Sequence, residues 1–171
     1  MVALSTQRLT LSPLLAQDAS ELFEVRGDPD AMAFRDWLPN ATPEMTPVVV
    51  DQLLKNAVSG NALFWTIRFR REASFVGLCD LSEIQPCQSA DIGFLVVRRL
   101  WNQGLAHEAV ACLLQYARES GLKSVHARIH SENERSERLL KRTGFRLIEE
   151  IPDYEIRPGI HRNCKRFEIA L

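Results

Sequence analysis

The stretch 90–145 constrains the fold most, because its pattern changes from strand to helix twice in succession. An apolar run over 90–97 is followed by a short turn and then by a helical pattern over about 104–120. A second strand is expected over 124–129 and a second helix over 133–142. The stretch therefore predicts a compact βαβα unit whose first helix begins directly after the turn.

The turn at 101–106, just ahead of that helix, predicts an anion-binding site. Backbone N–H groups at a helix N-terminus lack partners inside the helix and lie at the positive end of its dipole. The turn is not a Walker loop, because no Gly-Lys-Ser/Thr follows, and it is not GxGxxG, because it holds one glycine. A single glycine before a helix is also common in ordinary turns, so the ligand must be inferred from the rest of the chain.

The remaining chain predicts a mixed sheet with helices packed on it. Further strands are expected over 7–12, 62–69, 74–81, 145–151 and 164–171. Further helices are expected from Asp18 to about 26 and from Thr42 or Thr46 to about 59. The order β-αα-βββ-α-β-α-ββ indicates an α+β or mixed α/β fold with about seven strands, mostly antiparallel. A chain of 171 residues that is 46% hydrophobic suits one core, so we expect a single domain over 1–171.

Composition argues against several classes of protein. The 21 basic and 22 acidic residues give a net charge of −1, which provides no bulk basic field for a nucleic acid. No apolar stretch approaches the roughly 18 residues of a membrane span, and the N-terminus lacks a signal-peptide pattern. The four cysteines have no zinc-ribbon spacing, and His126 and His130 have no partners at ligand spacing. We therefore expect a cytoplasmic protein without a metal, a membrane anchor or a nucleic-acid partner.

Several short motifs agree with one family. They are Trp101-x-x-Gly104-x-Ala106-x-Glu108-Ala109, Ile92-Gly93-Phe94, Asn133-x-x-Ser136, Thr143-Gly144-Phe145 and the opening Thr6-Gln7-Arg8-Leu9-Thr10-Leu11. Together they resemble the GNAT superfamily of acyl-CoA-dependent N-acyltransferases. Trp101 stands where glutamine or arginine is usual in that superfamily. This resembles the RimJ/RimL branch, which acetylates protein N-terminal amines and includes relatives acting on small amines.

The resemblance implies an N-acetyltransferase that moves an acetyl group from acetyl-CoA to a primary amine by direct attack in a ternary complex. The acceptor would be a protein N-terminal α-amine or a small amine, and the enzyme would be a monomer or a homodimer. The pyrophosphate would bind the turn, and the pantetheine arm would pair with the strand edge before it. The cofactor-binding residues implied are Leu95, Val96, Val97, Arg99, Trp101, Asn102, Gln103, Gly104, Leu105, Ala106, His107, Asn133 and Ser136.

Acetyl transfer requires a group that removes a proton from the amine and a group that stabilises the departing thiolate. The carboxylates on strands leading into the site are Asp80, Glu83 and Asp91. Asp91 stands where the RimJ/RimL branch commonly carries a glutamate, so it is the first candidate to hold a water that takes the proton, and Glu83 is the second. Ser136 is expected to hydrogen-bond the thiolate, because Leu140 occupies the place of the tyrosine that many GNAT enzymes use as the acid.

The acceptor pocket is expected from the regions 34–37 and 152–160, whose acidic side chains would favour a cationic amine. The substrate-binding residues expected there are Phe34, Trp37, Asp153 and Tyr154. Two alternatives remain open. One is a CoA-binding sensor or regulatory module without catalysis, motivated by Leu140 and Asp91, and the other is an unrelated nucleotide-binding α/β protein.

Overall fold

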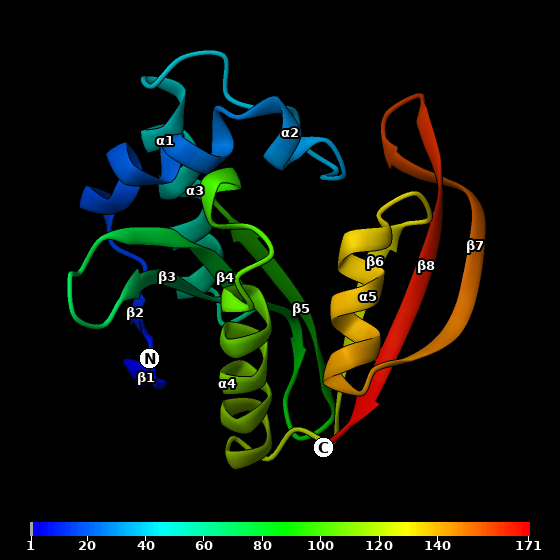
Figure 1. Ribbon diagram of the computed structural model, residues 1–171. Helices are drawn as coiled ribbons and strands as arrows, with labels where there is room; N and C mark the ends of the chain where they lie inside the picture. Colours follow the sequence, from blue (N-terminus) through cyan, green and yellow to red (C-terminus); the bar gives the residue numbers. More distant parts are fainter. Residues whose placement is uncertain (1) are drawn as a thin grey trace.

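The computed structural model describes residues 2–171, which form one eight-stranded sheet with helices on both faces (Figure 1). The strands are β1 (Leu4–Ser5), β2 (Leu9–Pro13), β3 (Leu63–Phe69), β4 (Phe75–Gln85), β5 (Ser89–Val96), β6 (Ser124–His130), β7 (Arg146–Arg157) and β8 (Ile160–Ala170). Their order in the sheet is β1-β2-β3-β4-β5-β6-β8-β7. Only the β5–β6 pair is parallel. The predicted mixed, mostly antiparallel α+β fold is confirmed, with the two-residue β1 as an additional strand.

The helices divide between the two faces of the sheet. They are α1 (Ala19–Arg26), α2 (Pro29–Met32), α3 (Met45–Val58), α4 (Leu105–Glu119) and α5 (Glu134–Thr143), with 3-10 turns at Ala16–Asp18 and Arg98–Leu100. Neighbouring residues of β3 show the division. Trp65 packs edge-to-face on Tyr116 of α4, whereas Thr66 donates to Asp18 just before α1. In Figure 1, α4 and α5 stand in front of the sheet and α3 lies behind it.

The boundaries of α4 and α5 agree with the prediction to within two residues, because both ends of each helix carry strong signals. Gly104, with a φ of 76°, directly precedes α4, and the side chains of α4 on the sheet side are buried. Asn133 caps α5, since its Oδ1 accepts the Ser136 N–H at 3.1 Å. Gly144 ends α5 in the left-handed region, with a φ of 101°.

Two helix-start predictions are wrong. Helix α3 begins at Met45, so neither Thr42 nor Thr46 is its cap, and Pro47 lies in the first turn, where its missing N–H costs nothing. Asp18 precedes α1 but makes no side-chain cap. Its carboxylate instead accepts from Thr66 at 2.7 Å and from Arg68 at 2.9 Å on β3, which ties the start of α1 to the sheet.

The last two strands are longer than predicted. The segment 152–160, expected to be an acceptor loop, is mostly the end of a long β7–β8 hairpin. The strand predicted over 145–151 continues through Pro152, because β7 is the edge of the sheet, where a residue without an N–H is tolerated. In Figure 1 this hairpin rises beside α5 as an arm of the sheet.

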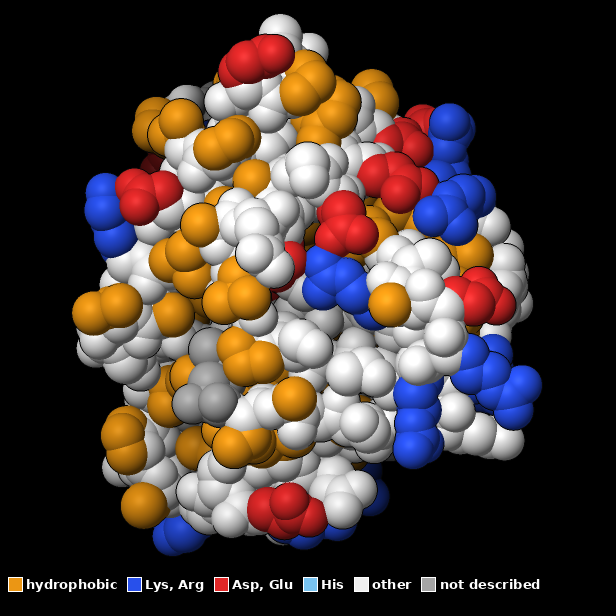
Figure 2. Space-filling view, turned by 90° about the vertical axis from the view of Figure 1, so that its left-hand side faces the viewer, with side chains coloured by type: hydrophobic (Ala, Val, Ile, Leu, Met, Phe, Trp, Pro, Cys, Tyr) orange, Lys and Arg blue, Asp and Glu red, His pale blue; other side chains and the backbone are white. Residues whose placement is uncertain are grey.

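The surface mixes charges of both signs. Figure 2 shows the side of the molecule on which β2 and β3 lie, where acidic and basic side chains stand next to each other and hydrophobic side chains are scattered between polar atoms. No single-sign field forms on this face, as the near-balanced composition predicts. None of the helices within residues 2–171 has the length and apolar character needed to cross a bilayer.

Candidate active site

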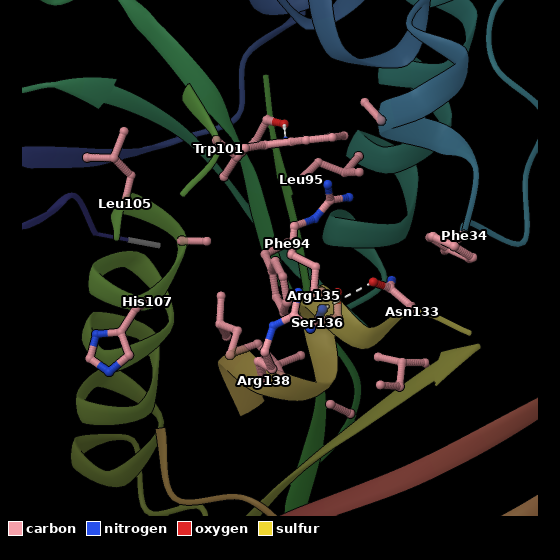
Figure 3. Close-up of a pocket in the computed structure, with 18 of the residues that line it drawn as sticks. Phe34, Phe94, Leu95, Trp101, Leu105, His107, Asn133, Arg135, Ser136 and Arg138 are labelled. Atoms are coloured by element: carbon pink, nitrogen blue, oxygen red, sulfur yellow. Dashed lines mark hydrogen bonds between the residues drawn. The ribbon is translucent and has the colours of Figure 1, made fainter. Parts of the chain in front are cut away.

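The parallel pair β5–β6 opens into a gap. Its pairing covers Ser89 to Asp91 on β5 and Ser124 to His126 on β6, and the two strands then separate. A pocket of about 460 Å³ lies in the gap, between the N-terminal ends of α4 and α5 (Figure 3). Its lining includes Ile92, Gly93, Phe94, Leu95, Val96, Ala127, Arg128 and Ile129 from the two strands. The broken pairing leaves a sheet edge facing the pocket over the length of β5 that carries the motif Ile92-Gly93-Phe94.

The predicted turn and the first turn of α4 form one end of this pocket. The lining there comprises Trp101, Asn102, Gly104, Leu105, Ala106 and His107. The hydrogen-bond ladder of α4 begins with the Glu108 N–H donating to the Gly104 carbonyl at 3.1 Å. The N–H groups of residues 105–107 therefore have no partner inside the helix and lie at its positive end. This end of the pocket suits a phosphate group.

Gln103, also predicted to bind the cofactor, does not line the pocket, and its carbonyl accepts a hydrogen bond from the Arg8 guanidinium at 2.9 Å. Arg8 Nε also pairs with Glu108 Oε2 at 2.6 Å, and the Arg8 backbone N–H donates to Glu108 Oε1 at 2.8 Å. Burial opposes the charge of Glu108, but hydrogen bonds from Thr6 and Arg8 outweigh it and lower the pKa of this carboxyl. The opening motif, through Arg8, and the turn motif, through Gln103 and Glu108, are thus in direct contact.

Glu108→Gln is expected to lower the free energy of unfolding by about 1–2 kcal/mol at pH 7, because it removes the ion pair and leaves Arg8 unmatched. A carboxyl whose pKa is lowered by folding stabilises the fold above its unfolded pKa and loses that contribution as the pH falls through its folded pKa. The difference between wild type and variant should therefore shrink in acid. Urea unfolding at pH 7 and near pH 3 measures both effects. An unchanged difference in the free energy of unfolding at the lower pH would show that the lowered pKa of Glu108 does not contribute to stability.

Trp101 joins the turn to both neighbouring elements. Its indole N–H donates to the Val96 carbonyl at 2.8 Å, and the Arg135 guanidinium of α5 lies 3.4 Å from the ring centroid (Figure 3). The Val97 N–H donates to the Val76 carbonyl at 3.0 Å. Of the strand-edge groups predicted to pair with the pantetheine arm, these two already have partners, so the edge offers fewer groups than expected.

Trp101→Ala is expected to destabilise the protein by about 2–4 kcal/mol, because it removes a large half-buried ring together with its hydrogen bond and cation–π contact. Trp101→Phe keeps a ring but not the N–H, and should cost about 1 kcal/mol. Chemical denaturation of both variants separates the contribution of the ring from that of the indole hydrogen bond. Equal losses would show that the indole N–H, and not the ring, holds the turn.

Basic side chains reach the pocket from a helix where sequence reasoning had not sought them. Arg135, Arg138 and Arg142 of α5 line the pocket at helical spacing i, i+3, i+7, a signal that was present in the sequence. Arg99, predicted to bind the cofactor, lies outside the lining and pairs with Glu24 at 2.8 Å. The neighbouring Arg98 is also paired with acidic side chains, so neither arginine is directed at the pocket.

The two predicted residues of α5 lie where they were expected. Ser136 lines the pocket at the first turn of α5, and Asn133 lies beside it with its Oδ1 bound to the Ser136 N–H (Figure 3). Leu140 is fully buried in the core, so its position offers no side chain to the pocket.

The three candidate carboxylates occupy different places. Asp80 of β4 lies over Gly93, where a Cβ would overlap its carboxylate, and Gly93 lines the pocket. Asp91 lies outside the lining, with its Oδ1 3.9 Å from His126 Nδ1. Glu83 is exposed at the far end of β4, with a φ of 48°, and is not brought to the pocket. None of the three carboxylates is itself part of the lining, but the Asp80 carboxylate lies directly against Gly93, which is.

Burial raises the pKa of the Asp80 carboxyl, and the charge of Asp91 adds to that effect. The nearby Arg35 and a hydrogen bond from Ser82 act in the opposite direction but do not cancel it. A carboxylate with a raised pKa is a stronger base than an exposed one, which suits the removal of a proton from an amine.

The other end of the pocket is formed by the segment after α2. Phe34 and Arg35 line it there, together with Arg128 of β6. Asp36 fixes this segment to β6, because its carboxylate accepts from Arg128 at 2.5 Å and contacts His130 Nε2 at 3.2 Å. Burial opposes the charge of Asp36, but His130 and Arg128 outweigh it and lower the pKa of Asp36.

The other residues expected to bind the acceptor are less directly placed. Tyr154 lies under Arg128, whose guanidinium is 4.2 Å from the ring centroid. Trp37 is 52% exposed and does not line the pocket. Asp153 lines a separate cavity of about 270 Å³ with His161. Within residues 2–171, no group of three His, Cys, Asp or Glu side chains is arranged to hold a metal ion.

The expected acidic character of the acceptor end is wrong. Asp28 and Asp30 pair with Arg98, and Asp36 pairs with Arg128. These carboxylates are therefore neutralised by arginines that are distant in sequence, and the side chains that reach the lining here are the basic ones, Arg35 and Arg128.

A comparison with protein-family models matches residues 8–146 to the acetyltransferase (GNAT) domain. The chain belongs to the GNAT acetyltransferase family. It is therefore an acyltransferase, and as a member of this family it is an acetyl-CoA-dependent N-acetyltransferase.

The GNAT chain is also similar to individual proteins over nearly its whole length. An uncharacterized N-acetyltransferase, p20, of Bacillus licheniformis is 28% identical over 161 residues, which cover 93% of this chain and 90% of p20. The structure of RimL, a ribosomal L7/L12 α-N-protein acetyltransferase in complex with coenzyme A, has a TM-score of 0.86 at 18% identity, covering 99% of this chain and 98% of RimL. Spermidine N-acetyltransferase from Vibrio cholerae, in complex with CoA and spermine, has a TM-score of 0.83 at 17% identity and covers 96% of both chains. These two structures confirm the fold.

Proposed function

We propose that this GNAT enzyme transfers the acetyl group of acetyl-CoA directly to a primary amine within a ternary complex in the β5–β6 gap. The observation that carries the proposal is the arrangement along one pocket. Free helix N–H groups lie at one end, an unpaired strand edge runs through the middle, and the Asp80 carboxylate, whose pKa is raised by burial, lies against Gly93 of the lining.

The cofactor fits this arrangement chemically. The pyrophosphate would accept hydrogen bonds from the N–H groups of residues 105–107, and Arg138 and Arg142 would balance further phosphate charge. The pantetheine amides would pair with the open edge of β5 between Ile92 and Val96. The thioester would then lie between Gly93 and the start of α5.

The residues at that point supply both halves of the acid–base chemistry. The amine nitrogen attacks the thioester carbonyl carbon, and Asp80 accepts the amine proton either directly or through a water. The C–S bond breaks as the tetrahedral intermediate collapses, and the Ser136 hydroxyl donates a hydrogen bond to the departing CoA sulfur. Within residues 2–171, none of the four cysteines lines the pocket, which favours direct transfer over an acyl-cysteine intermediate.

Two measurements test the proposal. Titration calorimetry with acetyl-CoA should show binding at one site per chain, and thiol release should rise when a suitable amine is added. In double-reciprocal plots with both substrates varied, intersecting lines are expected for a ternary complex. Parallel lines would exclude a ternary complex. Binding of acetyl-CoA without turnover on any amine would instead indicate a CoA-binding sensor on the same fold.

A further inference from the structure

Arg35 lies at the acceptor end of the pocket. Arg35 is half-buried and lines the pocket, and within residues 2–171 no carboxylate forms an ion pair with it. Arg128, the other arginine at this end, is neutralised by Asp36. The positive charge that faces an incoming acceptor therefore belongs to Arg35.

Arg35 lines the same pocket as Gly93, and the Asp80 carboxylate lies against Gly93. The Arg35 charge acts to lower the pKa of Asp80 without forming an ion pair with it. The acceptor end thus presents one guanidinium in the lining and one carboxylate behind it. An acceptor with one cationic and one anionic group on neighbouring atoms would match both.

The backbone of Arg35 is held in position. Asp36, the next residue, is fixed to Arg128 and His130 of β6. The Arg35 N–H donates to the Met32 carbonyl at 3.0 Å, and its guanidinium lies 5.7 Å from the centroid of the Trp37 ring. The fixed backbone and the neighbouring ring restrict the positions that the guanidinium can take, which reduces the entropy lost when it binds a carboxylate.

We propose that the acceptor is a free α-amino acid, with its amine directed to Asp80 and its α-carboxylate bound by Arg35. The inference rests on the proposed function and names the class of its acceptor. A peptide N-terminus would place a neutral amide opposite Arg35, and a polyamine would place a second cation there, where like charges repel. A free amino acid leaves neither Arg35 nor Asp80 unmatched.

The test compares each of the twenty common amino acids with its own C-terminal amide, by thiol release from acetyl-CoA. At least one free amino acid should have a kcat/KM about tenfold or more above that of its amide. Arg35→Gln should lower kcat/KM for that amino acid by about 10- to 100-fold, the value of a charge-assisted hydrogen bond, and by less than about twofold for the amide. The free amino acid and its amide differ in amine pKa. Dividing kcat/KM of the variant by that of the wild type for each acceptor cancels this difference.

Matched variants keep the test decisive. Arg35→Lys keeps the charge and should recover part of the loss, whereas Arg71→Gln, an exposed arginine in the β3–β4 turn, should change neither acceptor. The KM for acetyl-CoA should stay constant in all three variants. Three outcomes would overturn the inference. Amides or peptides would be acetylated as well as free amino acids, or Arg35→Gln would lower kcat/KM equally for the amino acid and its amide. The third is an enzyme that binds acetyl-CoA and acetylates no amino acid. Absence of acetyl-CoA binding would overturn the proposed function itself.

Discussion

Asp80→Asn is expected to lower kcat by about a hundredfold or more while leaving the affinity for acetyl-CoA within about twofold, because the amide keeps the shape of the side chain but cannot accept a proton. In the wild type, kcat/KM should fall as the pH drops below the raised pKa of Asp80, since the protonated carboxyl is no longer a base. Steady-state kinetics from pH 5 to 9 with one acceptor, together with calorimetry, measure both effects.

The same substitution should leave the protein folded. A carboxyl whose pKa is raised by folding disfavours the fold when it is ionised, above its folded pKa, and has no such effect below its unfolded pKa. Removing its charge should therefore cost no stability at pH 7, so lost activity would not reflect unfolding. Asp91→Asn and Glu83→Gln are the matched comparisons, and a larger loss of kcat in either would assign the base to that residue.

Ala106→Glu is expected to raise the Kd for acetyl-CoA by about a hundredfold or more. The new side chain would place a carboxylate at the helix end proposed to hold the pyrophosphate, and two like charges about 4 Å apart cost about 4 kcal/mol at an effective dielectric constant near 20. Glutamate is tolerated in the first turn of a helix, so α4 itself should still form. Calorimetric titration with acetyl-CoA measures the loss.

Ala111→Glu provides the control for this prediction, because Ala111 is exposed on the same helix and does not line the pocket. It adds the same charge to α4 and should leave the Kd within about twofold. If Ala106→Glu bound acetyl-CoA as the wild type does, the pyrophosphate would lie elsewhere in the pocket, and the arginines of α5 would become its principal partners.

The sequence predicted best the elements whose signals are local. The stretch from β5 to α5 was predicted closely because its periodicity, Gly104 and the Asn133 cap all act within a few residues of the boundary that they set. The start of α3 was missed because a Thr-Pro pair resembles a cap wherever it occurs. The end of β7 was predicted too early, since a proline at 152 is tolerated only where β7 is an edge strand, which the assembled sheet decides.

The site was predicted less completely because much of it depends on pairs that are distant in sequence. Composition shows that Asp28, Asp36 and Arg98 are charged, but not that each is matched by a side chain on another element. The sequence favoured Asp91 and Glu83 over Asp80, because only the sheet register shows that Asp80 lies against Gly93. That register also gives a physical reason for the glycine of the Ile92-Gly93-Phe94 motif, since any side chain there would displace the carboxylate.

The separation of β5 from β6 also bears on the order of events in a catalytic cycle. The pocket in the gap is lined by residues of α4 and α5 and, at its other end, by Phe34 and Arg35 after α2. In the proposed ternary complex, the nucleotide and the acceptor would occupy different ends of the pocket. CoA and the acetylated product would then dissociate in either order, and the slower dissociation would limit the rate of turnover.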